Sequence, residues 1–239
     1  RYHSPEGRGK YLPAAEYVYK AQAEGRGVYS FCMCPGGFVV PASTGPEETV
    51  VNGMSPANRG SRWANSGLVV ELHPEDIPAT GIRVEDPTSP LALMQWCEAF
   101  EHKSYLAANR SLRAPAQRMT DFVARRHSST LPSSSYTMGL TSSDLHEWMP
   151  DFITRRLSVG FRAFDRTTRG FLTGEAQLIG VESRTSSPVR IPRDRMTYAH
   201  PVVAGLYPAG EGAGFAGGIV SAAIDGENAA QQIALALGR

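Results

Sequence analysis

The sequence predicts an α+β protein, and three observations lead to this fold class. Four short β-branched or aromatic runs lie between residues 26 and 87, and helical periodicity replaces them over residues 88–165. Residues 201–239 then combine an apolar run, a glycine-rich turn and an amphipathic segment. Strands and helices segregated along the chain in this way are typical of α+β folds, here a mixed β-layer with a helical cap region.

Composition limits the class of protein. The 239 residues are 41% hydrophobic, enough to form the core of one or two compact domains. Lys plus Arg is 24 against 23 Asp plus Glu, a balance that argues against nucleic acid or an acidic membrane surface as a partner. There is no run of about 18 apolar residues, and residues 1–12 contain no apolar signal-peptide core. We therefore expect a soluble, cytoplasmic protein.

The first predicted domain, residues 1–87, is a helix followed by a β-layer. Residues Pro13–Glu24 are rich in Ala, with Pro at the first helical position and Gly25 as the stop signal, so they are predicted as a short helix. Turn residues then separate four predicted strands, at 28–34, 37–43, 48–54 and 66–72.

The second predicted domain, residues 88–200, is a mainly helical cap region with returning strands. Helices are predicted from Leu91, and from Pro115 to a basic end at His127. Asp144 can cap a short helix, and Pro150 starts a longer one. Extended character returns over residues 171–191.

The third predicted domain, residues 201–239, is a strand over 202–209, a glycine-rich loop and a helix with one apolar face. Glycines concentrated between residues 205 and 218 let the backbone approach a ligand or adopt a positive φ. A tight turn without a ligand is the alternative. Glu211 favours a ligand, because a carboxylate between two glycines can accept hydrogen bonds from sugar or polyol hydroxyls.

Two further groups could carry chemistry. Cys32 and Cys34 are two residues apart on a predicted strand, so both thiols could face one pocket; two small buried hydrophobes are the simpler interpretation. Arg184 and Arg190 flank three hydroxyls and could hold a phosphate or a polar ring edge, although an ordinary surface loop has the same composition. A polar cluster at residues 52–66 has the same two interpretations. No cysteine or histidine spacing predicts a metal site, and three cysteines argue against a disulfide framework.

Six segments together resemble the FAD-dependent dehydrogenases, also called NAD(FAD)-utilising dehydrogenases, which are related to BaiN-type flavoprotein reductases. They are RGVYSFCMCPGGFVVPAST, VVNGMS, ANSGLVVEL, APAQRMTDF, GVESRTSSPVRIPRD and GLYPAGEGAGFAGGIVSAAIDG, and they span most of the chain. The resemblance implies FAD as cofactor, with NAD(P)H as a potential electron donor. It also implies that residues 205–226 close a Rossmann-like FAD domain, with Glu211 near the ribityl or pyrophosphate region and Ile219 near the flavin pyrimidine edge.

The family begins with a βαβ unit carrying GxGxxG, and no such unit opens this chain. The string occurs once, at residues 212–217, but the helix behind it runs to the chain end without a second strand or a ribose-binding carboxylate. We therefore expect the C-terminal part of a longer flavoprotein, whose partner is the N-terminal FAD-binding segment of the same polypeptide.

The predicted function is hydride transfer between flavin N5 and an unknown small-molecule substrate in the intact oxidoreductase, with these 239 residues inactive alone. Cys32 and Cys34 are predicted as catalytic residues, and Arg184, Ser186 and Arg190 as substrate-binding residues. The predicted cofactor-binding residues are Gly210, Glu211, Gly212, Ala213, Gly217, Gly218 and Ile219. The alternatives are a non-catalytic binding or regulatory module with a flavoprotein-like fold, and a thiol-redox protein that uses the two cysteines.

Overall fold

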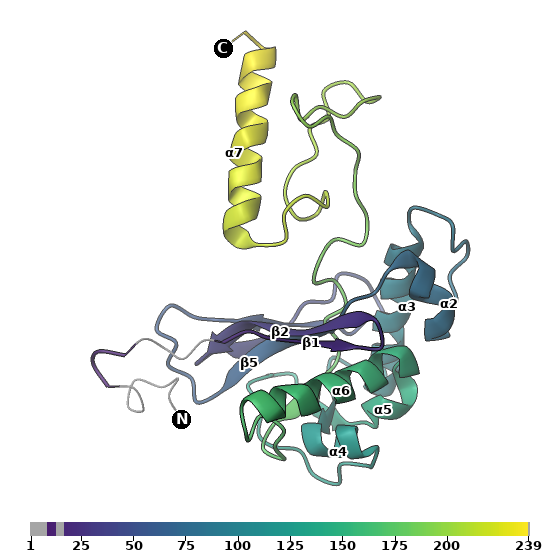
Figure 1. Ribbon diagram of the computed structural model, residues 1–239, viewed down its shortest axis with the longest axis vertical. Coiled ribbons are helices and arrows are strands. Elements are labelled where there is room, and N and C mark those ends of the chain that lie inside the picture. Colours follow the sequence, from purple (N-terminus) through teal and green to yellow (C-terminus); the bar gives the residue numbers. More distant parts are fainter. Residues whose placement is uncertain (1–8, 13–16, 239) are drawn as a thin grey trace. The chain divides into compact units, whose positions relative to one another are not determined.

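The computed structural model describes residues 9–12 and 17–238 of the chain (Figure 1). Small sheets and helices combine in it, in agreement with the predicted α+β class. The chain divides into two compact units: unit 1 contains residues 1–84 and 98–183, and unit 2 contains residues 85–97 and 184–239. Helix α3 (Ala92–Ala107) contributes residues to both. The division into three domains at residues 87 and 200 stays a prediction.

The first sheet of unit 1 is antiparallel, with strand order β1-β2-β5. Strands β1 (Tyr19–Ala23) and β2 (Arg26–Pro35) form a hairpin, and β5 (Ala64–Val70) pairs with the other edge of β2. Glu24 and Gly25 in the hairpin turn have φ values of 47° and 76°. Two successive positive φ values are typical of a type I′ turn, whose twist matches that of the flanking strands.

The predicted helix at Pro13–Glu24 is wrong where the structure describes the chain, because Tyr19–Ala23 is strand β1; residues 13–16 lie outside the described residues. The ring of Tyr19 packs on those of Phe164 and Phe171, with centroid distances of 5.3 and 5.1 Å. Pairing with β2 supplies hydrogen bonds along one edge of the segment. These tertiary contacts override a weak local helix propensity.

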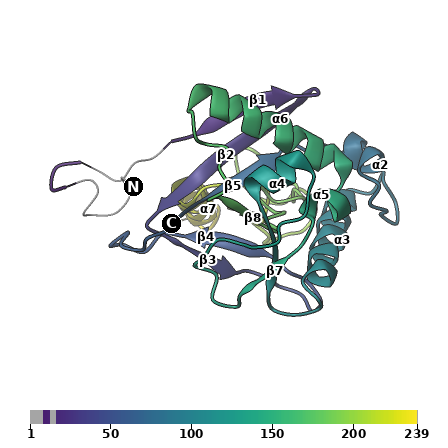
Figure 2. The same cartoon turned by 90° about the horizontal axis from the view of Figure 1, so that it is seen from below.

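Helix α6 (Asp151–Thr167) lies across β1, β2 and β5 (Figure 2). It begins directly after Pro150, as predicted, and its buried side chains recur at helical spacing at Phe152, Leu157, Phe161 and Phe164. These residues form the main core of unit 1 with Val28, Met119, Phe122, Leu145 and Leu178. Helix and sheet approach closely at Gly160, where an added Cβ would lie 2.5 Å from Cγ1 of Val28.

The four strands predicted as one layer belong to two sheets. Strands β3 (Phe38–Pro41) and β4 (Val51–Met54) form their own antiparallel pair. The third sheet has the order β7-β6-β8, in which β6 (Ala114–Arg118) is parallel to β7 (Leu140–Ser142) and antiparallel to β8 (Gln177–Ile179). Strand β8 is the regular part of the extended region predicted at 171–191.

The helix predicted from Pro115 is wrong in its first part, because Ala114–Arg118 is strand β6. Residues 114–117 are buried between two partner strands, which supply their hydrogen bonds, so the helix α4 (Met119–Ala124) begins only at Met119. The remaining helices of unit 1 are η1 (Pro74–Asp76), α2 (Ile77–Thr80) and α5 (Leu145–Trp148), and α5 follows Asp144 as predicted. No helix in the described part of the chain has the length and apolar character needed to cross a bilayer.

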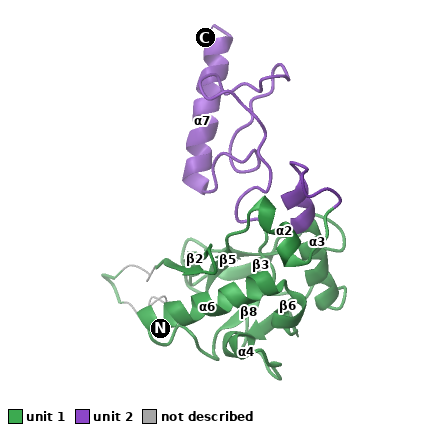
Figure 3. Cartoon of the chain, turned by 45° about the vertical axis from the view of Figure 1, so that its right-hand side comes forward, with its two compact units in different colours: residues 1–84, 98–183 green, residues 85–97, 184–239 purple. Residues whose placement is uncertain are grey.

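In unit 2, an irregular segment leads to helix α7 (Ile219–Ala236) (Figure 3). The predicted helix is therefore confirmed. The strand predicted at 202–209 is wrong: this segment forms bends and turns, because the described part of unit 2 contains no strand with which it could pair. The apolar face of α7 is largely exposed, with Ile219 93%, Val220 71% and Ile224 53% accessible.

Candidate functional site

Two candidate segments that are separate in the sequence form one site in unit 2. The glycine-rich segment, residues 205–218, packs against residues 187–193. The backbone N–H of Ile191 donates to the carbonyl oxygen of Ala213 at 3.2 Å, and the Ser187 hydroxyl donates to that of Gly212 at 3.3 Å. At Gly214, φ is +82° and an added Cβ would lie 2.6 Å from the carbonyl oxygen of Val189, so only glycine fits this contact.

Arg193 and Asp225 form an ion pair at the centre of this site. The two guanidinium nitrogens Nη2 and Nη1 donate to the carboxylate at 2.6 and 2.9 Å, and both side chains are largely buried. Arg193 also donates to the carbonyl oxygen of Pro208 at 2.8 Å, while Asp225 accepts the N–H of Gly210 at 2.8 Å. The hydrogen bonds from Arg193 hold the pKa of the Asp225 carboxyl below its usual value, although burial acts in the opposite direction.

Aromatic rings enclose the guanidinium of Arg193. Its Cζ lies 3.6 Å from the ring centroid of Phe215 and 4.1 Å from that of Tyr198. The guanidinium of Arg190 lies 4.4 Å from the same Phe215 ring and remains exposed. Sequence reasoning identified Arg190 but missed Arg193 and Asp225, because 32 residues separate the two partners and no local pattern links them.

Five of the predicted cofactor-binding residues are exposed, namely Glu211, Gly212, Gly217, Gly218 and Ile219, whereas Gly210 is half-buried and Ala213 is buried. Glu211 is exposed, and its carboxylate has no hydrogen bond or ion pair among the described residues. Gly218 is the N-cap of α7, with an extended backbone at φ −134°. An added Cβ at Gly212 or Gly217 would meet nothing within 4 Å, and neither residue has a left-handed φ. Nothing within the described chain therefore requires glycine at positions 212 and 217.

Cys32 and Cys34 lie at a β-bulge in β2. Phe31 pairs with Gly67 but Cys34 pairs with Asn65, so β2 contains one extra residue, and Cys32 has a φ of 51°. The bulge breaks the strict alternation on which the predicted common pocket depended. Cys32 is exposed and Cys34 is half-buried.

The environment of Cys34 does not favour a thiolate. Burial raises the pKa of the Cys34 thiol, Cys32 and Glu182 raise it further, and Arg59 opposes the shift. Cys34 is therefore protonated at neutral pH, whereas a cysteine nucleophile acts as the thiolate. A catalytic role for Cys32 and Cys34 stays a prediction.

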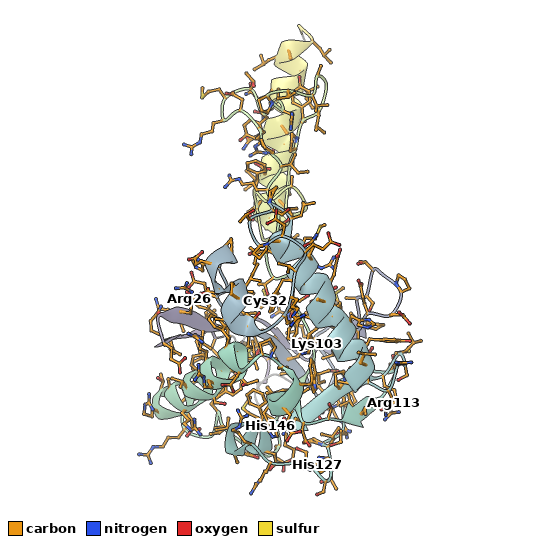
Figure 4. All side chains as sticks on the ribbon, turned by 90° about the vertical axis from the view of Figure 1, so that its right-hand side faces the viewer. Arg26, Cys32, Lys103, Arg113, His127 and His146 are labelled. Carbon is orange, nitrogen blue, oxygen red and sulfur yellow. The ribbon has the colours of Figure 1, made fainter. Side chains whose placement is uncertain are left out.

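Three other polar side chains, those of Arg62, His127 and His146, have structural partners in unit 1. His127 pairs with Asp144 at 3.0 Å, and the buried His146 contacts Gln117 at 2.8 Å; both histidines lie away from Cys32 (Figure 4). Arg62 stacks on Trp63 and donates to the Ser133 hydroxyl at 2.9 Å. Among the described residues, no group of three or more His, Cys, Asp or Glu side chains could hold a metal ion.

Comparison with known proteins identifies the family. A family model described as "FAD-dependent protein, C-terminal domain-like" matches residues 1–185. The chain belongs to this family. It is also 42% identical over 226 residues to an uncharacterized protein of Clostridium beijerinckii (strain ATCC 51743 / NCIMB 8052), across 93% of this chain but 41% of that protein. The chain thus spans less than half the length of this relative.

Membership in this family confirms the predicted likeness to FAD-dependent proteins and supports FAD as the cofactor, while dehydrogenase activity stays a prediction. The match ends within two residues of Ser183, the last residue of unit 1. The glycine-rich segment and α7 follow this boundary, so they lie outside the matched C-terminal domain. The relation to BaiN-type reductases and the use of NAD(P)H stay predictions.

Proposed function

We propose that this chain is the C-terminal part of an FAD-dependent oxidoreductase. Unit 1 supplies the substrate-side domain, and residues 184–239 complete a Rossmann-like FAD domain together with an N-terminal segment of the same polypeptide. The main support is the shared boundary: the family match and unit 1 both end near residue 184, so the glycine-rich segment and α7 lie beyond it.

The residues of unit 2 suit a dinucleotide cofactor in three respects. Open space at Gly212 and Gly217 lets a ligand approach the backbone. The accessible carboxylate of Glu211 can accept hydrogen bonds from ribose or ribityl hydroxyls. The guanidinium of Arg190, oriented on Phe215, can hold a phosphate or an anionic substrate. Arg184 and Ser186 are proposed to contribute to the same anionic contact.

The exposed face of α7 suits the missing part of the FAD domain. Ile219, Val220 and Ile224 form an apolar strip on the helix, joined near its end by Leu235 and Leu237, both 67% accessible. Exposed apolar strips of this kind mark surfaces that another element covers. We propose that the sheet of the N-terminal FAD-binding segment covers this strip.

Bound FAD would supply the chemistry, by accepting or donating a hydride at N5. The residues of this chain would bind and orient: Glu211 holds hydroxyls, Arg190 holds an anionic group, and the backbone at Gly217 and Gly218 forms a close contact surface. The raised pKa of Cys34 makes the thiol-redox alternative less favourable, since that chemistry needs a thiolate.

The complete gene product tests the proposal. We expect it to purify with bound flavin, visible as blue-light absorption, and Glu211→Ala should lose flavin with little change in the melting of the apoprotein. Glu211→Gln is the matched control for shape without charge, and should retain an intermediate affinity. A colourless complete protein that does not bind added FAD would contradict the proposal and favour the non-catalytic module.

The 239-residue chain provides a second comparison. Titrated with FAD under the same conditions, it should show no saturable binding, because the βα turn that receives the pyrophosphate would be absent. Saturable micromolar binding would show that the chain holds a complete cofactor site. It would contradict the proposal that an N-terminal segment contributes to the FAD domain.

A further inference from the structure

The glycine-rich segment is ordered without a substantial apolar core. Residues 184–218 contain no helix or strand, and their buried side chains are those of Pro208 and Ala213. Burial of two small side chains contributes little hydrophobic stabilisation. The conformation of this segment must therefore depend on polar and stacking contacts.

Those contacts converge on Arg193 and Asp225. Oδ2 of Asp225 accepts both the Gly210 N–H at 2.8 Å and Nη1 of Arg193 at 2.9 Å. Nη1 of Arg193 also bonds the carbonyl oxygen of Pro208 at 2.8 Å. The pair thus joins three parts of unit 2: residues 187–193, the glycine-rich segment and helix α7.

The backbone around the pair is built to enclose the guanidinium. Tyr198 has a φ of 61°, a left-handed conformation that is unfavourable for an aromatic residue, and its ring lies over Arg193. Asp194 stabilises this turn by accepting the N–H groups of Met196 and Thr197 at 2.9 and 2.8 Å. Strained backbone persists where the surrounding contacts hold it in place.

We infer that Arg193 and Asp225 are positioning residues that hold the glycine-rich segment in its ligand-binding conformation before the ligand arrives. The inference rests on the proposed function for the identity of the ligand, FAD. Glu211 lies between two fixed neighbours, since Asp225 bonds the N–H of Gly210 and Ser187 bonds the carbonyl oxygen of Gly212. When the segment is ordered before FAD binds, the free energy of binding is not reduced by the conformational entropy lost in ordering it.

Arginine is needed at position 193 for a geometric reason. A guanidinium can donate in parallel to both carboxylate oxygens while its flat face stacks between two rings; an ammonium can do neither. Lysine at this position would keep the charge but lose the two-pronged bond and the stacking on Phe215 and Tyr198. Arg193→Lys therefore tests the geometry of the pair rather than its charge.

The test uses the complete gene product and measures FAD affinity by flavin fluorescence. Arg193→Lys and Asp225→Asn should each raise the dissociation constant by about tenfold or more, the effect of losing a charge-assisted hydrogen bond. At saturation, the flavin absorption spectrum should match the wild type, because the contacting residues are unchanged. Arg195→Lys and Glu227→Gln are the matched controls, both exposed and without a hydrogen bond or ion pair among the described residues, and should bind as the wild type does.

Amide hydrogen exchange without FAD separates this inference from the proposed function. Residues 208–218 should exchange faster in Arg193→Lys and Asp225→Asn, while helix α6 exchanges at the wild-type rate. Unchanged exchange would overturn the holding role, and faster exchange with unchanged FAD affinity would overturn the positioning role. A wild type without FAD affinity would overturn the proposed function, and the exchange data would still decide whether the pair holds the segment.

Discussion

Substitution of Gly217 by alanine should change fold stability and cofactor binding in opposite directions. An alanine Cβ at this position would meet nothing within 4 Å, and Gly217 does not have a left-handed φ. The folded chain can therefore accept the methyl group, and the loss of unfolded-state freedom should stabilise it by about 0.4–1 kcal/mol. If FAD packs on the backbone here, the same methyl group occupies the position of the ligand.

The expected loss of affinity follows from the cost of overpacking. Inserting a methyl group into a close contact costs about 1–3 kcal/mol, equivalent to a dissociation constant about 5- to 150-fold higher. Urea unfolding of the complete gene product measures the first effect, and titration with FAD measures the second. A higher free energy of unfolding together with a lower affinity for FAD indicates a ligand contact. Damage to the fold would lower both the free energy of unfolding and the affinity.

Two other glycines serve as controls. At Gly174 in unit 1, an added Cβ would lie 3.6 Å from Oγ1 of Thr120, an ordinary contact, so Gly174→Ala should not alter FAD affinity. Gly214→Ala should damage unit 2 itself, because of the positive φ and the 2.6 Å approach to Val189. Wild-type FAD affinity in Gly217→Ala would refute the reasoning and favour a plain turn without a ligand.

Three further predictions concern acidity, thiol reactivity and packing. Arg193 lowers the pKa of Asp225 in the folded protein. The ionised carboxylate therefore stabilises the fold fully at pH values above about 3.9, the ordinary pKa of Asp, and this stabilisation is lost as the pH falls through the lower pKa of the folded protein. The protection of the amides in residues 208–218, taken relative to their intrinsic exchange rates, should fall below about pH 4 in the wild type. In Asp225→Asn this protection should already be low and show no acid step, and an identical acid step in the variant would contradict the assignment. Iodoacetamide should alkylate exposed Cys32 before Cys34 and buried Cys97 at neutral pH, as mass spectrometry can follow, and a faster Cys34 would show that its thiol is activated. Gly160→Ala should lower the free energy of unfolding. Overpacking against Val28 costs about 1–3 kcal/mol, which exceeds the roughly 1 kcal/mol that alanine gains over glycine in a helix. A rise in the free energy of unfolding, measured in urea, would mean that α6 can move away from β2.

The elements that the sequence predicts correctly are those with a strong local signal. Helix α6 follows Pro150 with apolar residues at helical spacing, and α7 has the same regularity after a dense run of glycines. Strands β2 to β5 are short β-branched or aromatic runs between turn residues. In each case the residues that determine the element lie within a few positions of one another.

The errors arise where the conformation depends on a distant partner. Tyr19–Ala23 and Ala114–Arg118 become strands because neighbouring strands form hydrogen bonds with their backbones, and residues 202–209 remain irregular because the described part of unit 2 offers no such neighbour. The β-bulge that separates Cys32 from Cys34 likewise comes from the register against β5.

The sequence by itself determined the fold class, the glycine-rich segment before the last helix, and the likeness to FAD-dependent proteins. Only the tertiary structure brought residues 187–193 onto that segment and paired Arg193 with Asp225 across 32 positions. The physical reason is that periodicity and turn propensity act over a few residues. An ion pair stacked between aromatic rings requires the chain to fold back on itself, and no local pattern encodes that contact.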